Sequence, residues 1–350
     1  MARVILTLVT LLSGCGLWAS GSGMMAPQAQ SLKSEALTPP WIEPDFPFFS
    51  SVVDARRAGA GFPTNNLTPR ALVLRVGLDH WVAFDIDLLR VAAIWRGPGV
   101  TPAALAPGSY HRPDRKTPGG QSPLPEPDGT VWLANGIYPG WQTGMRLSYE
   151  DPREPAPSPE EVGRGPLSEE AGRFKAIRQV RDGVVLEYTA GGADVRESLT
   201  VSEADSAWTL VRHFRVGPSA RQLWVALGAT SAVVGLVEPL SATLSLEQVP
   251  GTVPAWAVRV PAHQAPVAFS VAFRNGPAAP PGAQRTMPSD APAARWPQDV
   301  TTTVTRSASK DAYVVDDIAL PFDNPWKRNV RLCDVAFFKD GTAADRKSVV

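Results

Sequence analysis

The chain has 350 residues and no formal net charge, because 34 Lys and Arg residues balance 34 Asp and Glu residues. This balance excludes electrostatic steering toward nucleic acid or an anionic membrane surface. Proline, with 35 residues, outnumbers glycine, with 29, while 44% of the residues are hydrophobic. Proline is poorly tolerated in helix interiors and central strands, so this composition predicts a folded protein of short elements joined by long connections, which favours β architecture.

We expect a targeting signal at residues 1–22. Arg3 precedes an apolar run, Val4–Leu12, that is too short to span a bilayer. The sequence Leu-Ser-Gly-Cys that ends at Cys15 resembles a bacterial lipobox, so Cys15 is the expected lipidation site; ordinary signal cleavage a few residues later is the alternative. Both routes predict an exported protein, periplasmic or extracellular, and lipidation would anchor it to a membrane without a spanning helix. Residues 23–40 follow as a polar tether.

Residues 41–306 are expected to form a large antiparallel β-sandwich of the supersandwich type. The proline-broken, aromatic segment 41–51 is expected to cover a sheet edge rather than to form a strand. Further strands are predicted at residues 67–76, 130–141, 174–181, 184–189, 193–201, 208–216, 221–227, 242–248, 256–261 and 267–273. No window of 11 residues has helical periodicity, so this series of strands favours a sandwich over βαβ units.

The densest core-forming segment spans residues 73–97. In its first strand Val82, Phe84 and Ile86 alternate with Trp81, Ala83, Asp85 and Asp87. Because strand side chains alternate between faces, the first set is expected in the core and the second set outside or in a cleft. The apolar run 88–95 that follows carries one charge, Arg90.

The C-terminal part changes in character. A Pro/Ala-rich linker is predicted near residues 275–297, and residues 300–306 are a possible closing strand of the sandwich. Residues 313–344 have the pattern of an opening strand pair of a second domain. We interpret residues 345–350 as a non-native tail, because they resemble a translated sequencing adapter, and we expect the chain to be a truncated fragment.

Three sequence segments resemble those of a known family: residues 83–90 (AFDIDLLR) with Trp95-Arg96-Gly97, residues 183–188 (GVVLEY) and residues 320–341 (LPFDNPWKRNVRLCDVAFFKDG). With them the chain resembles the N-terminal part of large exported bacterial proteins. In these proteins an uncharacterised β domain precedes a propeller similar to glucose/sorbosone dehydrogenases, often with cytochrome c or haem-binding modules. The resemblance implies that residues 313–344 begin such a propeller. It also implies that any redox chemistry, its cofactors and its partner modules belong to the region downstream, with no cofactor in this chain.

The candidate catalytic residues are Asp85, Asp87 and His80. Two carboxylates on one strand face can share general acid and base roles or bind a cation. The alternative is structural: a solvated strand face, or Asp87 paired with Arg90. His213, flanked by two arginines, is expected at the surface or in a cleft.

Trp81, Trp141 and Arg90 are the candidate ligand-binding residues, because exposed Trp rings stack on sugars; Trp141 is the strongest candidate for exposure. The alternative for a tryptophan is the sandwich core. The two cysteines, Cys15 and Cys333, and the histidine spacing predict no metal site.

The leading functional hypothesis is a non-catalytic accessory or ligand-binding domain, carbohydrate-related, on an exported redox-type protein. The first alternative is a sugar-processing enzyme in which Asp85, Asp87 and His80 line a cleft. The second is a structural module that docks the downstream propeller. The expected partners are a polysaccharide or sugar and the downstream modules, with no nucleic acid and no membrane contact beyond the lipid.

Overall fold

The computed structural model describes residues 47–101, 124–155, 164–181, 183–204, 207–237, 243–276, 298, 300–320, 323–325, 335–337 and 343–345. Cys15, Cys333 and the segments expected as signal and tether lie outside these ranges, as does the expected linker apart from residues 275 and 276. The described ranges are built from strands, and no helix among them is long and apolar enough to cross a membrane. The chain divides into two compact units, Cys15–Pro292 and the combination of Met1–Gly14 with Ala293–Val350.

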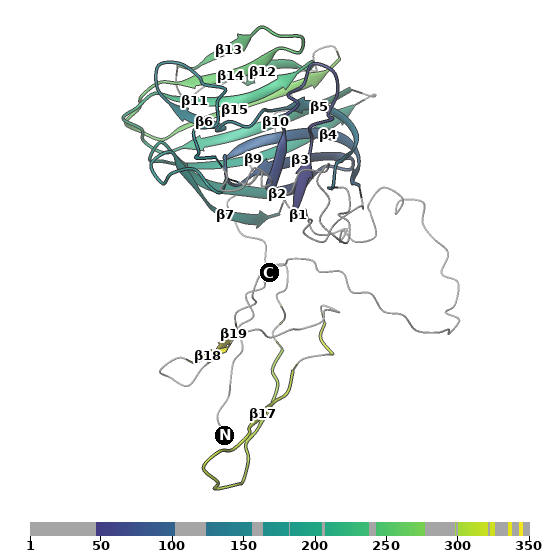
Figure 1. Cartoon of the computed structure of the whole chain (residues 1–350), viewed down its shortest axis with the longest axis vertical. Coiled ribbons are helices and arrows are strands. Elements are labelled where there is room, and N and C mark those ends of the chain that lie inside the picture. The colour runs from purple at the N-terminus through teal and green to yellow at the C-terminus, as the bar shows by residue number, and fades with distance from the viewer. Residues whose placement is uncertain are drawn as a thin grey trace, which may run out of the picture. The chain divides into compact units, whose positions relative to one another are not determined.

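The larger unit consists of two antiparallel sheets (Figure 1). The first sheet is built from β1 (Phe48–Asp54), β2 (Leu67–Val76), β3 (His80–Asp85), β4 (Arg90–Val100), β5 (Pro127–Ala134), β11 (Leu223–Thr230), β14 (Ala255–Val260) and β13 (Ser245–Val249), with β6 (Trp141–Thr143) paired to β11. The second sheet is built from β12 (Val233–Val237), β15 (Val267–Asn275), β10 (Ala207–Val216), β9 (Ala193–Ala204), β8 (Gly183–Ala190) and β7 (Gly172–Val180). The expected all-β class and antiparallel pairing are therefore confirmed.

One hydrophobic core joins the two sheets. It contains Val82 and Phe84 of β3, as the strand alternation predicts, together with side chains of β8, β10 and β15. Aromatic rings cross the interface: the centroids of Trp132 and Trp208 lie 4.2 Å apart. Burying each large apolar side chain contributes about 1.5–3 kcal/mol, so this interface is the main source of stability of the sandwich.

The opposite face of β3 departs from the prediction. Every residue of β3 is buried. Trp81 and Ala83 pack in a second apolar cluster with Val53, Val73 and Trp95, and this cluster covers the face expected to lie outside or in a cleft. The prediction for this face is therefore wrong, because β3 is a central strand with apolar packing on both sides.

Strand β1 is also a correction. Residues 48–54 pair antiparallel with β2, from Phe48 opposite Leu74 to Asp54 opposite Leu67. The prolines that argue against a strand precede this pairing, at Pro44 and Pro47. The aromatic segment therefore supplies an edge strand instead of a cover over the edge.

The smaller unit contains two short strand pairs among its described residues. β16 (Val304–Thr305) pairs with β17 (Asp317–Ile318), and β18 (Val335–Phe337) pairs with β19 (Ala343–Asp345). Residues 304 and 305, expected to close the sandwich, thus pair within the smaller unit. The described part of this unit does not form a propeller.

Gly77 in the β2–β3 turn allows the two sheets to approach closely. Its φ is +78°, and an added Cβ would lie 2.3 Å from Cγ1 of Val201 in β9. Gly77→Ala is expected to lower the free energy of unfolding by about 1–3 kcal/mol more than Gly192→Ala, because overpacking adds to backbone strain. Gly192 is the matched control: its φ is +89°, with open space around its Cβ position. Equal losses in urea unfolding would contradict the steric explanation.

Candidate functional site

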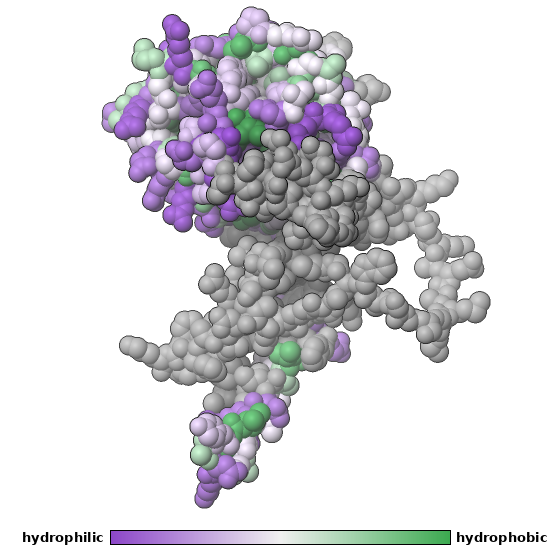
Figure 2. All heavy atoms as spheres, in the orientation of Figure 1, coloured by the Kyte–Doolittle hydropathy of each residue, from purple (hydrophilic) through white to green (hydrophobic). Residues whose placement is uncertain are grey.

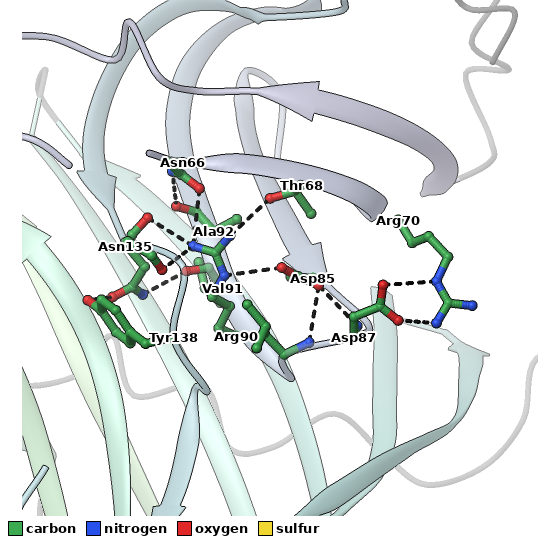
Figure 3. Close-up of polar contacts among 12 residues, drawn as sticks. Asn66, Thr68, Arg70, Asp85, Asp87, Arg90, Val91, Ala92, Asn135 and Tyr138 are labelled. Atoms are coloured by element: carbon green, nitrogen blue, oxygen red, sulfur yellow. Dashed lines mark hydrogen bonds and ion pairs between the residues drawn. The ribbon is translucent and has the colours of Figure 1, made fainter. Parts of the chain in front are cut away.

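Arg90 is the centre of the polar cluster that the sequence singles out (Figure 3). The residue opens β4, and its guanidinium is fully buried. Its Nε donates to Asp85 Oδ2 at 3.1 Å, and its Nη1 donates to the carbonyls of Asn135 and Gly136 at 2.9 and 2.6 Å. Further acceptors are Asn66 Oδ1 at 3.1 Å and Thr68 Oγ1 at 3.3 Å. Burial lowers the pKa of Arg90, an effect that the Asp85 carboxylate opposes.

The two aspartates hold the turn between β3 and β4. Asp85 Oδ1 accepts the backbone N–H groups of Asp87 and Leu88 at 3.0 and 3.2 Å. Leu89, with φ of +52°, reverses the chain before Arg90. The Asp87 carboxylate forms a bidentate ion pair with Arg70, with Nε of Arg70 3.0 Å from Oδ2. Asp87 therefore pairs with Arg70 and not with Arg90.

The amides of Asn66 and Asn135 complete the cluster. Asn66 Nδ2 donates to the carbonyl of Ala92 at 2.8 Å, and Asn135 Nδ2 donates to the carbonyl of Val91 at 2.7 Å. Tyr138 donates its hydroxyl to Asn135 Oδ1 at 2.5 Å, and burial raises the pKa of this phenol to about 12. The cluster is thus a structural network. The carboxylates of Asp85 and Asp87, which catalysis would need free, already have hydrogen-bond partners within the fold.

A second buried network joins the two sheets. Trp141 of β6 donates its Nε1 to the Tyr188 hydroxyl at 2.9 Å, and Tyr188 donates to Glu197 Oε2 at 2.6 Å. Arg212 Nε donates to Glu197 Oε1 at 2.8 Å. Burial, followed by the nearby Glu197 charge, raises the pKa of Tyr188 well above its ordinary value, which keeps the phenol protonated as a donor.

His213 is buried in β10, which corrects the expected surface or cleft position. Its Nε2 lies 2.9 Å from Thr200 Oγ1, and its Nδ1 lies 2.9 Å from Ser270 Oγ. These hydroxyls belong to the flanking strands β9 and β15, so the imidazole bridges three neighbouring strands. Burial lowers its pKa to about 4.

The low pKa of His213 predicts acid sensitivity. The folded-state pKa lies below the ordinary value near 6.5, so folding disfavours protonation, and the stability gained above pH 6.5 is lost as the pH falls toward 4. The loss from this group approaches about 3 kcal/mol at and below pH 4. Urea unfolding between pH 7 and pH 4 checks this, with His213→Gln expected to flatten the pH dependence. An unchanged slope in His213→Gln would contradict it.

A third polar group lies at the start of β3. His80 is fully buried, and its ring meets Trp208 edge to face with centroids 5.3 Å apart. Its Nδ1 lies 3.0 Å from Asp79 Oδ1 and 3.2 Å from Oε1 of Glu203 near the end of β9. Arg96 pairs with the other oxygen of each carboxylate. Burial lowers the pKa of His80, which the two carboxylates only partly offset. Among the described residues this group has the donor set for a metal ion.

The structure separates the candidate catalytic residues. His80 and Asp85 stand at opposite ends of β3, which corresponds to about 16 Å at the rise of a β-strand. They also point to opposite faces, since His80 contacts the tryptophans of the large core and Asp85 contacts Arg90. His80, Asp85 and Asp87 thus do not line one cleft.

The candidate ligand-binding residues are buried. Trp141, expected to be the most exposed, is only 2% exposed, and Trp81 is 1% exposed. Both indole N–H groups already donate, Trp141 to Tyr188 and Trp81 to the carbonyl of Gly97. The predicted exposure of Trp141 is therefore wrong, because the ring packs in the core of the sandwich.

One part of the chain matches a known protein family. Residues 82–197 match a family described as a domain of unknown function (DUF6797), which agrees with the expectation of an uncharacterised domain. The matched segment runs from β3 into β9 and includes Asp85, Asp87, Arg90 and Glu197. No curated protein and no solved structure matches the chain. The residues that form the two buried networks thus lie largely in the segment that matches this domain of unknown function.

Proposed function

We propose that the sandwich of residues 47–276 is a non-catalytic accessory domain of a larger exported, redox-type protein. The observation that carries this proposal is the closure of the Arg90 network. Asp85 accepts two backbone N–H groups and one guanidinium N–H, and Asp87 holds Arg70 in a bidentate pair. General acid and base catalysis needs carboxyl groups within reach of a substrate, and these two are committed to the turn and to arginines.

The size of a pocket between the two sheets supports the same proposal. A pocket between β2, β8 and β9 has a volume of about 210 Å³ and is lined mainly by Leu74, Val76, Val184, Leu199 and Val201. Ligand sites usually enclose roughly 300–1,000 Å³ and contain convergent polar groups. This pocket is smaller, and Asp85, Asp87 and Trp141 are not part of its lining.

The visible surface also fits an accessory role. In Figure 2 hydrophilic residues dominate the visible face of the sandwich, and hydrophobic residues occur there in small separate groups. A large exposed apolar patch would mark an apolar interaction site. Contacts of the visible face with a partner or a sugar would therefore be mainly polar.

The wider context rests on the resemblance of the sequence. Export through the N-terminal signal, lipidation of Cys15, a downstream propeller and cytochrome partners are parts of this proposal. Strand β18 falls within the segment assigned to the start of the propeller, and its partner β19 begins in that segment and ends at Asp345, the first residue of the assigned tail. A polysaccharide remains the proposed ligand class, and it would bind at a surface other than buried Trp81 and Trp141.

The test uses the full chain with soluble and insoluble polysaccharides and a panel of chromogenic glycosides. We expect no hydrolysis above the buffer control. Retention on a polysaccharide would favour the carbohydrate-binding role, and its absence would favour the docking role. Hydrolysis that disappears in Asp87→Asn while the melting temperature is unchanged would overturn the proposal and support the sugar-processing enzyme.

A further inference from the structure

The group at the start of β3 brings together residues that are far apart in the sequence. Asp79 lies in the β2–β3 turn and His80 begins β3, both in the first sheet, whereas Glu203 lies near the end of β9 in the second sheet. Asp79 Oδ1, His80 Nδ1 and Glu203 Oε1 all lie within 4.8 Å of one another. One imidazole and two carboxylates from two sheets thus converge at one point.

The hydrogen bonding of His80 is incomplete, which is a separate observation. Both ring nitrogens of this fully buried side chain lack a hydrogen bond, and so does the buried Oδ1 of Asp79. Nδ1 lies close to the two oxygens, at 3.0 and 3.2 Å, without the alignment of a hydrogen bond. Unsatisfied buried polar atoms are costly, and a bound ion is one of the arrangements that satisfy them.

We propose that Asp79, His80 and Glu203 bind a divalent transition-metal ion of the zinc type. Bonds of about 2.0–2.1 Å place neighbouring ligand atoms about 2.8–3.4 Å apart in octahedral or tetrahedral geometry, and the separations of 3.0 and 3.2 Å from Nδ1 fall in this range. The imidazole favours zinc and its neighbours over calcium and magnesium, which take oxygen ligands. The third separation, between Asp79 Oδ1 and Glu203 Oε1, is at most 4.8 Å. Glu203 is the most exposed of the three side chains, so its carboxylate can move to bring this separation into the same range.

Arg96 contacts both carboxylates of this site from the side away from His80 Nδ1. Its Nε lies 2.5 Å from Asp79 Oδ2, and its Nη2 lies 3.7 Å from Glu203 Oε2. Arg96 stands opposite His80 in the β3–β4 pairing, which places its guanidinium beside both carboxylates. The arginine thus engages the outer oxygen of each carboxylate and leaves the inner oxygen of each available to an ion.

The ion would join the two sheets at this end of the sandwich. Three protein ligands leave at least one coordination position for water, and Asp79 and Glu203 are partly accessible to solvent. The site therefore combines a structural link with an open position. This proposal does not depend on the accessory role of the domain.

The test is isothermal titration of zinc chloride into the untagged, chelator-treated full chain carrying Cys15→Ser and Cys333→Ser, which removes the thiols as competing ligands. We expect one saturable site with micromolar or tighter affinity. Glu203→Gln is expected to weaken binding at least tenfold. Glu247→Gln is the matched control, because Glu247 is a similarly exposed carboxylate paired with an arginine, Arg259, and should leave affinity unchanged.

Two further measurements make the result independent of any activity. Cobalt(II) should produce visible absorption bands that zinc removes, and calcium or magnesium in tenfold excess should not compete. Glu203 is partly exposed, so its glutamine variant is expected to fold, which circular dichroism checks. Absence of saturable binding, or equal affinity in Glu203→Gln and the parent chain, would overturn the proposal.

Discussion

Asp85→Ala is expected to lower the free energy of unfolding by about 3–5 kcal/mol, because it leaves the buried Arg90 charge without its carboxylate. The remaining partners of Arg90 are neutral: two carbonyls, an amide oxygen and a hydroxyl. The substitution also removes the acceptor for the N–H groups of Asp87 and Leu88, which hold the turn into β4. Chemical denaturation of both proteins measures the loss.

Two companion variants accompany this test: one separates the loss of the charge from the loss of turn geometry, and the other is a surface control. Asp85→Asn keeps an oxygen for the turn but removes the charge, so its loss should fall between those of wild type and Asp85→Ala. Asp194→Ala is the control, because Asp194 is exposed and pairs with exposed Lys175; such surface pairs contribute about 0–1 kcal/mol. If the free energy of unfolding of Asp85→Ala lies within about 1 kcal/mol of that of wild type, the structural role assigned to Asp85 is wrong.

The sequence predicts the strands well because alternation and turn signals are local. The predicted strand at residues 67–76 coincides with β2, and the predicted strand at residues 208–216 lies within β10. β12 is absent from the prediction, since its five residues include Gly235 and provide little alternation. Local patterns identify strands, but they do not show what packs on the second face of a strand.

That second face is the reason the site prediction differs from the structure. Asp85 looks solvent-facing because apolar Phe84 and Ile86 flank it, yet Arg90, five residues later, neutralises it inside the fold. Trp141 looks exposed beside Pro139 and Gly140, yet its partner Tyr188 lies 47 residues further along the chain. Glu203 is 123 residues from His80, so no spacing motif could indicate that they meet. The last two contacts are set by how the two sheets pack on each other, which strand alternation alone does not determine.

Glu197→Ala is the second substitution with a large expected effect, about 3–5 kcal/mol of unfolding free energy. Glu197 and Arg212 lie on neighbouring strands β9 and β10 and are both almost completely buried. Nη1 of Arg212 already lacks a hydrogen bond, and its guanidinium lies 5.0 Å from the Phe214 ring centroid. Loss of Glu197 would leave this cation in an apolar layer and take the acceptor from Tyr188.

The double variant Glu197→Met with Arg212→Met tests the cause of that loss. Replacing both members of a buried ion pair by apolar side chains is often neutral or stabilising, so we expect it to recover most of the stability lost in Glu197→Ala. Recovery would show that the unpaired buried charge of Arg212, and not the missing Tyr188 contact, causes most of the loss of stability. A double variant as unstable as Glu197→Ala would instead assign the cost to the Trp141–Tyr188–Glu197 chain, because that chain is a buried polar link between the two sheets.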